Sequence, residues 1–244
     1  MTESISKEKR FARPSRITFT GADPTCTLSE LLALAQVDRR IEFAFLYSET
    51  KAGAGRYPPA RWIAETAREI ERAYGFGRVA LHVCGRAVRK LLRGERLDPD
   101  LGSLWRFQRI QLNGHLDVED GGRLRQLLGE YAGWQIITQY DSNPSLHDLI
   151  RRPGHQVLFD SSGGRGIERL EWPRHLGDWT CGYAGGLGHD NLASQLPLIA
   201  AAAAGALDGY WIDMESKLRN DADQFSTGLA RLALDAIVAA ESRL

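Results

Sequence analysis

Short apolar segments alternate with amphipathic, helix-length segments along the whole chain. The segments between the apolar runs carry apolar residues at three- and four-residue spacing, which is typical of helices with one buried face. A repeated strand–helix order predicts a parallel sheet covered by helices. The expected strands and their tips cover residues 17–20, 41–47, 79–84, 109–112, 134–140, 156–160, 180–188 and 209–216.

Several helix boundaries are marked by local signals. Thr27 and Glu30 fit a capping box, which predicts a helix that begins at about Leu28. Pro58-Pro59 opens a second helix, which is expected to run to Tyr74 and to end at Gly75. Further helical segments are expected at 87–92, at 123–131, after Pro144, and at 222–242.

Eight strands, each followed by a helical or helix-length segment, favour one fold class: α/β, a single parallel (β/α)8 TIM barrel. The length of 244 residues agrees with the roughly 250 residues of such a barrel. The rival fold is a doubly wound open sheet, but no Gly-x-Gly-x-x-Gly follows the first strand. We therefore expect a disordered or extended tail at 1–15 and a barrel at 16–244.

Composition and charge exclude several classes of function. Lys plus Arg and Asp plus Glu are 31 each, so no overall field favours nucleic acid or acidic membranes. No apolar run approaches the roughly 20 residues that span a bilayer, and the first ten residues are charged and lack the apolar stretch typical of a signal peptide. The three cysteines, Cys26, Cys84 and Cys181, form neither a paired framework nor a zinc-binding spacing. We expect a cytoplasmic protein without a metal or cofactor.

Polar residues gather at the expected carboxyl ends of the strands, where barrels place their chemistry. Asp160 ends an apolar strand and is followed by a glycine-rich turn, so we predict a catalytic or ligand-binding role for it; it can act as a general acid if burial raises its pKa. Pairs of polar residues two apart would face one pocket with it: His82 and Cys84, Gln111 and Asn113, Gln139 and Asp141, and Asp213 and Glu215. Each pair has a structural alternative: His82 is interpreted as a hydrogen-bonded core residue, and Asp213 as a candidate anchor for a neighbouring loop.

Glycines after the seventh strand indicate how an anionic ligand could bind. Gly185 and Gly186 allow the backbone to approach a ligand closely. A short helix that begins near Ser216 would direct backbone N–H groups at the same place, which suits a phosphate group. A plain turn is the alternative interpretation.

Motifs in chain order along nearly the whole barrel resemble the phosphoribosylanthranilate isomerase family. They are Gly55-Arg56-Tyr57, Ile110-Gln111-Leu112-Asn113-Gly114, Leu158-Phe159-Asp160-Ser161 with Gly163-Gly164-Arg165-Gly166, Tyr183 to Asn191, and Ile212 to Ser216. The resemblance implies an aldose–ketose isomerase of tryptophan biosynthesis, which performs an Amadori rearrangement of a phosphoribosyl amine. It also implies that Asp160 is the general acid, that Arg56 binds the substrate carboxylate, and that Gly185, Gly186 and Ser216 hold the phosphate. We add Gln111, Asn113, Gly163 and Gly164 to the expected substrate-binding residues.

The sequence departs from the family pattern at the base and at the phosphate loop. Thr20 stands where the family has its cysteine base, and a hydroxyl is far too weak an acid to replace a thiolate. We take Thr20 and Cys84 as the candidate catalytic positions beside Asp160, with Cys84 the candidate replacement base. Glu215 and Lys217 replace a serine and a glycine of the family and are expected to contact the substrate.

Two other functions remain open. The chain could be a diverged paralogue that acts on another small phosphorylated or carboxylated substrate as an isomerase or lyase, with or without a divalent metal. It could also be a non-catalytic barrel that binds a ligand. In each case the expected partner is a small molecule, with no nucleic acid or membrane, and the expected state is a monomer or homodimer.

Overall fold

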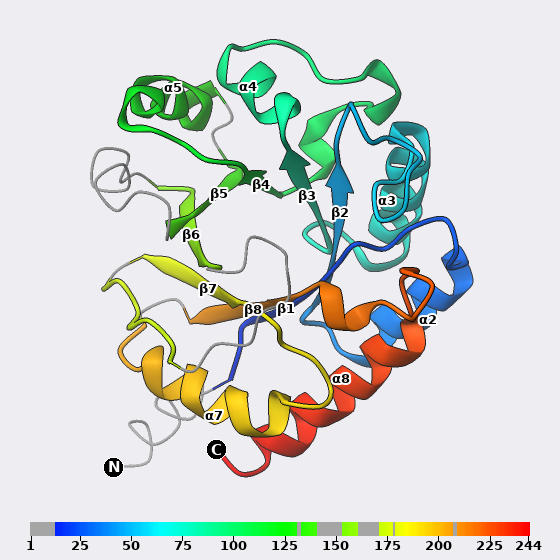
Figure 1. Cartoon of the computed structure of the whole chain (residues 1–244), viewed down its shortest axis with the longest axis vertical. Helices are drawn as coiled ribbons and strands as arrows, with labels where there is room; N and C mark the ends of the chain where they lie inside the picture. Colours follow the sequence, from blue (N-terminus) through cyan, green and yellow to red (C-terminus); the bar gives the residue numbers. More distant parts are fainter. Residues whose placement is uncertain (1–12, 131–132, 141–152, 161–170, 178, 207–208) are drawn as a thin grey trace.

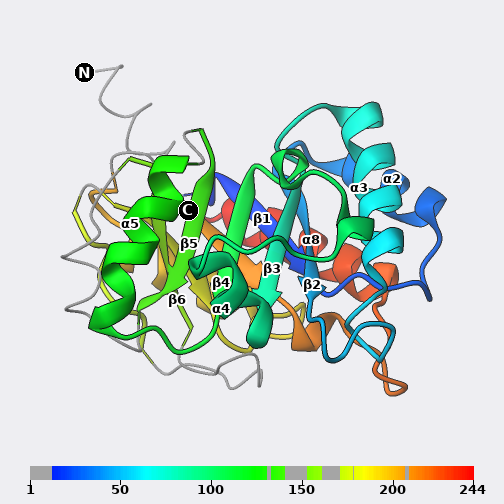
Figure 2. The ribbon, with the colours of Figure 1, turned by 90° about the horizontal axis from the view of Figure 1, so that it is seen from above.

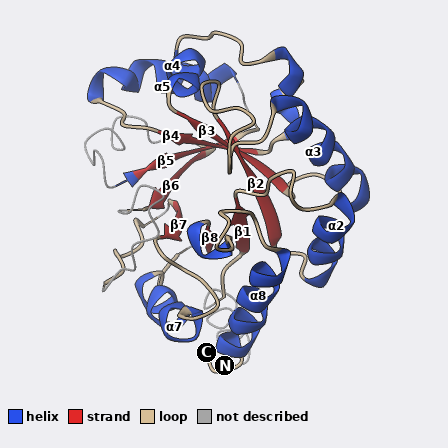
Figure 3. Ribbon diagram, turned by 45° about the vertical axis from the view of Figure 1, so that its right-hand side comes forward, coloured by secondary structure: helices blue, strands red, loops and turns tan. Residues whose placement is uncertain are grey.

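A closed barrel of eight parallel strands forms the centre of the molecule (Figures 1 and 3). The computed structural model describes residues 13–130, 133–140, 153–160, 171–177, 179–206 and 209–244. Neighbours in the barrel follow the chain order, and β1 closes it against β8. The strands are β1 Arg16–Thr20, β2 Ile41–Tyr47, β3 Val79–Cys84, β4 Arg109–Asn113, β5 Gln135–Gln139, β6 His155–Phe159, β7 Thr180–Ala184 and β8 Tyr210–Met214. The predicted fold class, a single (β/α)8 barrel, is confirmed.

Helices surround the strands on the outside of the barrel; α5 and α3, for example, lie on opposite sides of it in Figure 2. The helices are α2 Leu28–Val37, α3 Ala60–Tyr74, α4 Arg86–Leu92, α5 Gly121–Glu130, α7 Leu192–Ala202 and α8 Thr227–Glu241. Single 3-10 turns lie at η1 Pro99–Leu101, η2 Leu104–Arg106, η3 Val118–Asp120 and η5 Ser216–Leu218. Within the described residues, no helix is long and apolar enough to cross a membrane.

The predicted signals at the helix ends are present. Thr27 and Glu30 form the reciprocal hydrogen bonds of a capping box at the start of α2. Gly75 ends α3 with φ 82°, a left-handed conformation that favours glycine. The last helix, however, begins at Thr227, so the predicted start at 222 was wrong. The Asn220 side chain accepts hydrogen bonds from the backbone N–H groups of Ala222 and Gln224, and this local turn delays the helix. The helix expected after Pro144 lies outside the described residues.

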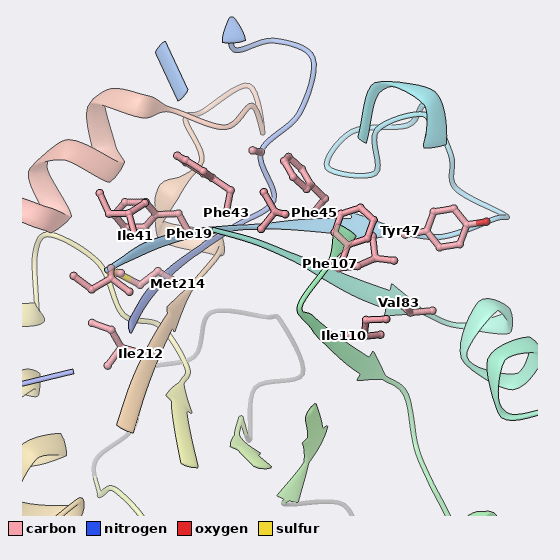
Figure 4. Close-up of a cluster of buried hydrophobic side chains, with 14 of the residues drawn as sticks. Phe19, Ile41, Phe43, Phe45, Tyr47, Val83, Phe107, Ile110, Ile212 and Met214 are labelled. Carbon is pink, nitrogen blue, oxygen red and sulfur yellow. The ribbon is translucent and has the colours of Figure 1, made fainter. Parts of the chain in front are cut away.

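The main apolar core fills the layer between the strands and the helices. Figure 4 shows part of it, where Phe19, Phe43 and Met214 lie close together beside the crossing strands. These three side chains are almost fully buried. Burial on this scale is the main force that closes the barrel, since it removes apolar surface from water.

The inside of the barrel is more polar. A small apolar cluster of Ile137, Leu158, Ala184 and Trp211 occupies it. Arg109 lies near the amino ends of the strands and makes a buried ion pair with Glu42 at 2.6 Å. Its guanidinium carbon also lies 4.3 Å from the centre of the Trp211 ring. A cavity of about 290 Å³ remains at this amino end and is lined in part by Arg16, Arg109 and Trp211. Barrels place their chemistry at the opposite, carboxyl end of the strands.

Candidate functional site

A polar cavity of about 490 Å³ opens at the carboxyl ends of the strands. The size suits a small molecule. The residues that line it come from seven strands or the loops that follow them. They are Leu46, Lys51, Arg56, Tyr57, His82, Cys84, Gln111, Asn113, Gly114, His115, Gln139, Leu158, Asp160, Ala184, Gly185, Gly186, Leu187, Asp213, Glu215 and Ser216.

Asp160 follows β6 directly and lines this cavity. Its carboxylate accepts a 3.4 Å hydrogen bond from Nε2 of Gln139 at the end of β5. The side chain is half-buried, so it can meet both a ligand and its protein neighbours. The structure places Asp160 at a strand tip, and its role as an acid stays a prediction.

Asp213, near the end of β8, is the buried carboxyl group of the site. Its Oδ1 accepts a 2.6 Å hydrogen bond from the hydroxyl of Thr20 on the neighbouring strand. Burial raises the pKa of Asp213 to about 8, and the nearby carboxylates of Glu215 and Asp160 also raise it, while the bond from Thr20 lowers it. Asp213 is therefore largely protonated at neutral pH and becomes a carboxylate in mildly basic solution.

His82 lies beside Asp213 on the cavity wall. Its Nε2 is 3.8 Å from Oδ2 of Asp213. Burial, helped by the charge of Arg109, lowers the pKa of His82 to about 3, so the imidazole is neutral at physiological pH. The side chain is only 2% exposed, as a core histidine would be. A neutral His82 does not offset the negative charge that Asp213 acquires when it loses its proton.

Cys84 also lines the cavity, at the end of β3. Its sulfur accepts a 3.6 Å hydrogen bond from Nδ2 of Asn113, whose own Oδ1 accepts one of 2.8 Å from Gln111. Burial raises the pKa of the Cys84 thiol to about 12. A thiol with this pKa holds almost no thiolate at neutral pH, so its position is right for a base but its protonation state is not.

Arg56 and Glu215, which both line the cavity, form an ion pair. Arg56 comes from the loop after β2, and its Nη1 donates a 2.6 Å hydrogen bond to Oε1 of Glu215, which follows β8. Its Nη2 donates one of 2.9 Å to Oδ1 of Asp223. Burial raises the pKa of Glu215, and Arg56 opposes that shift. Both terminal nitrogens of Arg56 are thus bonded to carboxylates of the protein.

The residues predicted for phosphate binding are only partly assembled. Gly185 and Gly186 line the cavity with φ 124° and 62°, values that favour glycine, and Ser216 begins η5 beside them. Lys217 is not among the lining residues; its ammonium group bonds Asp190 at 2.7 Å. Gly163 and Gly164 lie outside the described residues.

Thr20 is buried and does not line the cavity, so its hydroxyl reaches the site only through Asp213. Strand periodicity predicted that Asp213 and Glu215 face the same pocket, with a loop anchor as the alternative for Asp213, and it assigned Asp213 no catalytic role. Lys51, Tyr57 and His115 line the cavity from loops, and no sequence signal places them there.

No group of three or more His, Cys, Asp or Glu side chains that could hold a metal ion occurs in the described part of the chain. The carboxyl groups of the site are instead engaged by Thr20, Gln139 and Arg56. The arrangement brings several carboxyl groups to one cavity, which suits acid–base chemistry.

The sequence matches no protein-family model, and no curated protein is significantly similar to it. Solved structures do resemble it. TrpF from Jonesia denitrificans has a TM-score of 0.61 and 14% identity, over 92% of this chain and 97% of that one. Phosphoribosyl anthranilate isomerase from Thermus thermophilus has a TM-score of 0.53 and 18% identity, over 92% and 98%.

An enzyme of another type resembles the chain almost as well. A putative fructose-1,6-bisphosphate aldolase from Coccidioides immitis has a TM-score of 0.51 and 11% identity, over 98% of this chain and 90% of that one. At such low identity these likenesses establish the fold and leave the reaction open. The chain therefore has the (β/α)8 fold seen in phosphoribosylanthranilate isomerases, as the sequence motifs predict.

Proposed function

We propose that this chain is an aldose–ketose isomerase that performs an Amadori-type rearrangement of a phosphoribosyl amine. The observation that carries the proposal is a pair of carboxyl groups, Asp160 after β6 and Asp213 on β8, which line one polar cavity. Their mutual repulsion helps to hold the pKa of Asp213 near 8. A carboxyl group whose pKa lies near the working pH can exchange a proton with a substrate, so Asp213 is suited to acid–base catalysis beside Asp160.

The rearrangement needs one proton donor and one proton acceptor. Protonation of the ring oxygen breaks its bond to C1, and the nitrogen lone pair then forms a C1=N double bond. Removal of the proton on C2 supplies the electron pair for a C1=C2 double bond, and the C=N pair returns to nitrogen. The resulting enol gives up its hydroxyl proton and gains a proton at C1, which leaves a ketone at C2.

In the proposed mechanism Asp160 protonates the ring oxygen and Asp213 removes the proton from C2. Asp213 takes the part that cysteine plays in the family that the sequence resembles. A carboxylate with a pKa of about 8 is a much stronger base than an ordinary carboxylate, and its pKa lies close to the working pH. Thr20 positions that carboxylate through its 2.6 Å hydrogen bond. Cys84 is less suited, because its thiol stays protonated.

The phosphate of the substrate would bind near Gly185, Gly186 and Ser216. The positive φ angles of the two glycines bring backbone toward the cavity without a Cβ in the way. This placement supports a phosphorylated substrate. With the phosphate bound there, the sugar ring would lie in the part of the cavity that Asp160 and Asp213 line.

The experiment is turnover of phosphoribosylanthranilate and of phosphoribosylaniline, followed by proton NMR in water and in D2O. Isomerisation replaces the single C1 proton of the sugar by a C1 methylene, and in D2O one deuteron enters at C1. Asp160→Asn and Asp213→Asn should each lower kcat by about 100-fold or more, since positioned acids and bases contribute about 10²–10⁴. Absence of turnover of both amines by folded wild-type protein would refute the proposal.

A further inference from the structure

The strongest unassigned feature of the site is the pair of protein carboxylates that hold Arg56. Glu215 and Asp223 each accept a hydrogen bond from a different terminal nitrogen of the guanidinium group, at 2.6 and 2.9 Å. The Arg56 and Glu215 side chains are 26% and 18% exposed. A guanidinium group binds a carboxylate best through two parallel N–H donors, and here each terminal nitrogen already gives one of its two N–H groups to a protein carboxylate.

The Arg56–Glu215 pair is held by a larger ion-pair network. Asp223 also accepts a 2.6 Å hydrogen bond from Nε of Arg219, and Nη2 of Arg219 pairs with Asp23 at 2.7 Å. Arg219 and Asp23 are both almost fully buried. Because Arg219 is anchored in this way, it fixes the loop that carries Asp223 beside Arg56. An incoming anion would have to displace carboxylates that the fold itself keeps in place.

The charges along the cavity leave little else for a substrate carboxylate. Apart from Arg56, Lys51 is the one lysine or arginine that lines the cavity among the described residues. Lys51 is exposed, and its ammonium group lies 5.1 Å from the centre of the Tyr57 ring. An ion pair at such an exposed position gains little free energy, because water screens it. The Glu215 carboxylate meanwhile lies on the same wall.

We propose that Glu215 is a built-in carboxylate that occupies Arg56, so that the site accepts phosphoribosyl amines whose amine portion carries no carboxylate. This inference rests on the proposed function and names its substrate class. The resemblance implies that a substrate carboxylate pairs with Arg56, and here the carboxylate of Glu215 takes that place. A neutral amine portion would pack beside the Arg56–Glu215 pair without meeting either an unpaired cation or a second anion.

The first test compares two substrates that differ in one group. Phosphoribosylaniline lacks the ortho carboxylate of phosphoribosylanthranilate and is otherwise the same. Wild-type protein should give the higher kcat/KM with phosphoribosylaniline. Glu215→Gln removes the negative charge and keeps the shape, so the ratio of kcat/KM for the anthranilate compound to that for the aniline compound should rise at least tenfold.

A matched control is Glu65→Gln. Glu65 pairs with Arg61 on the exposed face of α3 at 2.9 Å, so this variant changes the net charge equally but away from the cavity. It should leave the ratio unchanged. A wild-type preference for phosphoribosylanthranilate, or a ratio that Glu215→Gln does not alter, would overturn the inference while leaving the isomerase function intact.

A binding measurement separates failure of the inference from failure of the function. Benzoate and benzamide have nearly the same shape, but benzamide carries an uncharged amide where benzoate carries the carboxylate that would meet Arg56. The binding of both can be followed by NMR without any turnover. Glu215→Gln should bind benzoate at least tenfold more tightly than wild type does and should bind benzamide equally well. Equal benzoate affinity in the two proteins would overturn the role of Glu215. Tighter benzoate binding without turnover of either amine would uphold that role and refute the isomerase.

Discussion

The hydroxyl of Thr20 donates a 2.6 Å hydrogen bond to Oδ1 of Asp213, and both side chains are buried. The threonine stands at the position where the resembling family has its cysteine base. Its hydroxyl cannot serve as a base, but it bonds to a carboxyl group that can. The substitution therefore transfers the candidate basic group from β1 to the adjacent strand β8, which pairs with β1 to close the barrel.

We predict that Thr20→Val shifts the pH profile of kcat/KM to higher pH. Turnover should rise as Asp213 loses its proton, with a midpoint near pH 8 in the wild type. The bond from Thr20 stabilises the carboxylate, so its loss raises the pKa further. Thr20→Ser retains a hydroxyl and should keep the wild-type profile. A carbon NMR titration of Asp213 should likewise give a higher pKa in Thr20→Val than in the wild type and in Thr20→Ser. A shift to lower pH in Thr20→Val would contradict the prediction.

Asp213 should also make the stability of the protein depend on pH. Its folded pKa, about 8, lies above the ordinary aspartate pKa of 3.8, so the folded state binds more protons between these pH values. The stabilisation is fully present below about pH 4 and is lost as pH rises through 8. Compared with Asp213→Asn, which does not titrate, the wild type should lose free energy of unfolding between pH 5 and pH 8. Urea titrations of both proteins measure this difference, and a constant difference would exclude the shifted pKa.

Cys84→Ala should keep most of the turnover at pH 7 to 8. Burial raises the pKa of the thiol to about 12, so fewer than about one protein in 10⁴ carries a thiolate at that pH. The variant removes a cavity wall contact and should change kcat by only a few-fold. A loss as large as that expected for Asp213→Asn would return the role of base to Cys84. The comparison is made in the same NMR assay, with thermal unfolding as the check on folding.

Much of the barrel could be predicted from sequence because its signals are local. The apolar runs set the bounds of β2, Ile41–Tyr47, and β3, Val79–Cys84, as expected. Gly75 marked the end of α3, because a backbone with positive φ is unfavourable for residues that have a side chain. The start of α8 was missed, since Asn220 competes for backbone N–H groups and sequence cannot tell which hydrogen bonds prevail.

The site was predictable only in outline. Strand periodicity placed Asp160, Cys84 and Glu215 at one end of the barrel, where they line one cavity. The partner of Arg56 was not predictable, because Glu215 is 159 residues away and reaches it across a loop. The pKa of Asp213 likewise depends on burial and on neighbours from other strands. Contacts between residues far apart in the sequence can be known only from the folded structure.

Gly182→Ala should destabilise the barrel by about 1–3 kcal/mol or more, because it overfills the interior. Gly182 on β7 pairs with Trp211 on β8, and a Cβ at this glycine would lie 2.1 Å from Cε2 of the indole ring. The ring cannot move aside easily, since it is almost fully buried beside Arg109. Gly129→Ala is the control: it lies in α5 with open space around a Cβ, and alanine there should stabilise by up to about 1 kcal/mol. Urea unfolding of both variants gives the two free energies, and an undamaged Gly182→Ala protein would show that Trp211 does not pack against this strand.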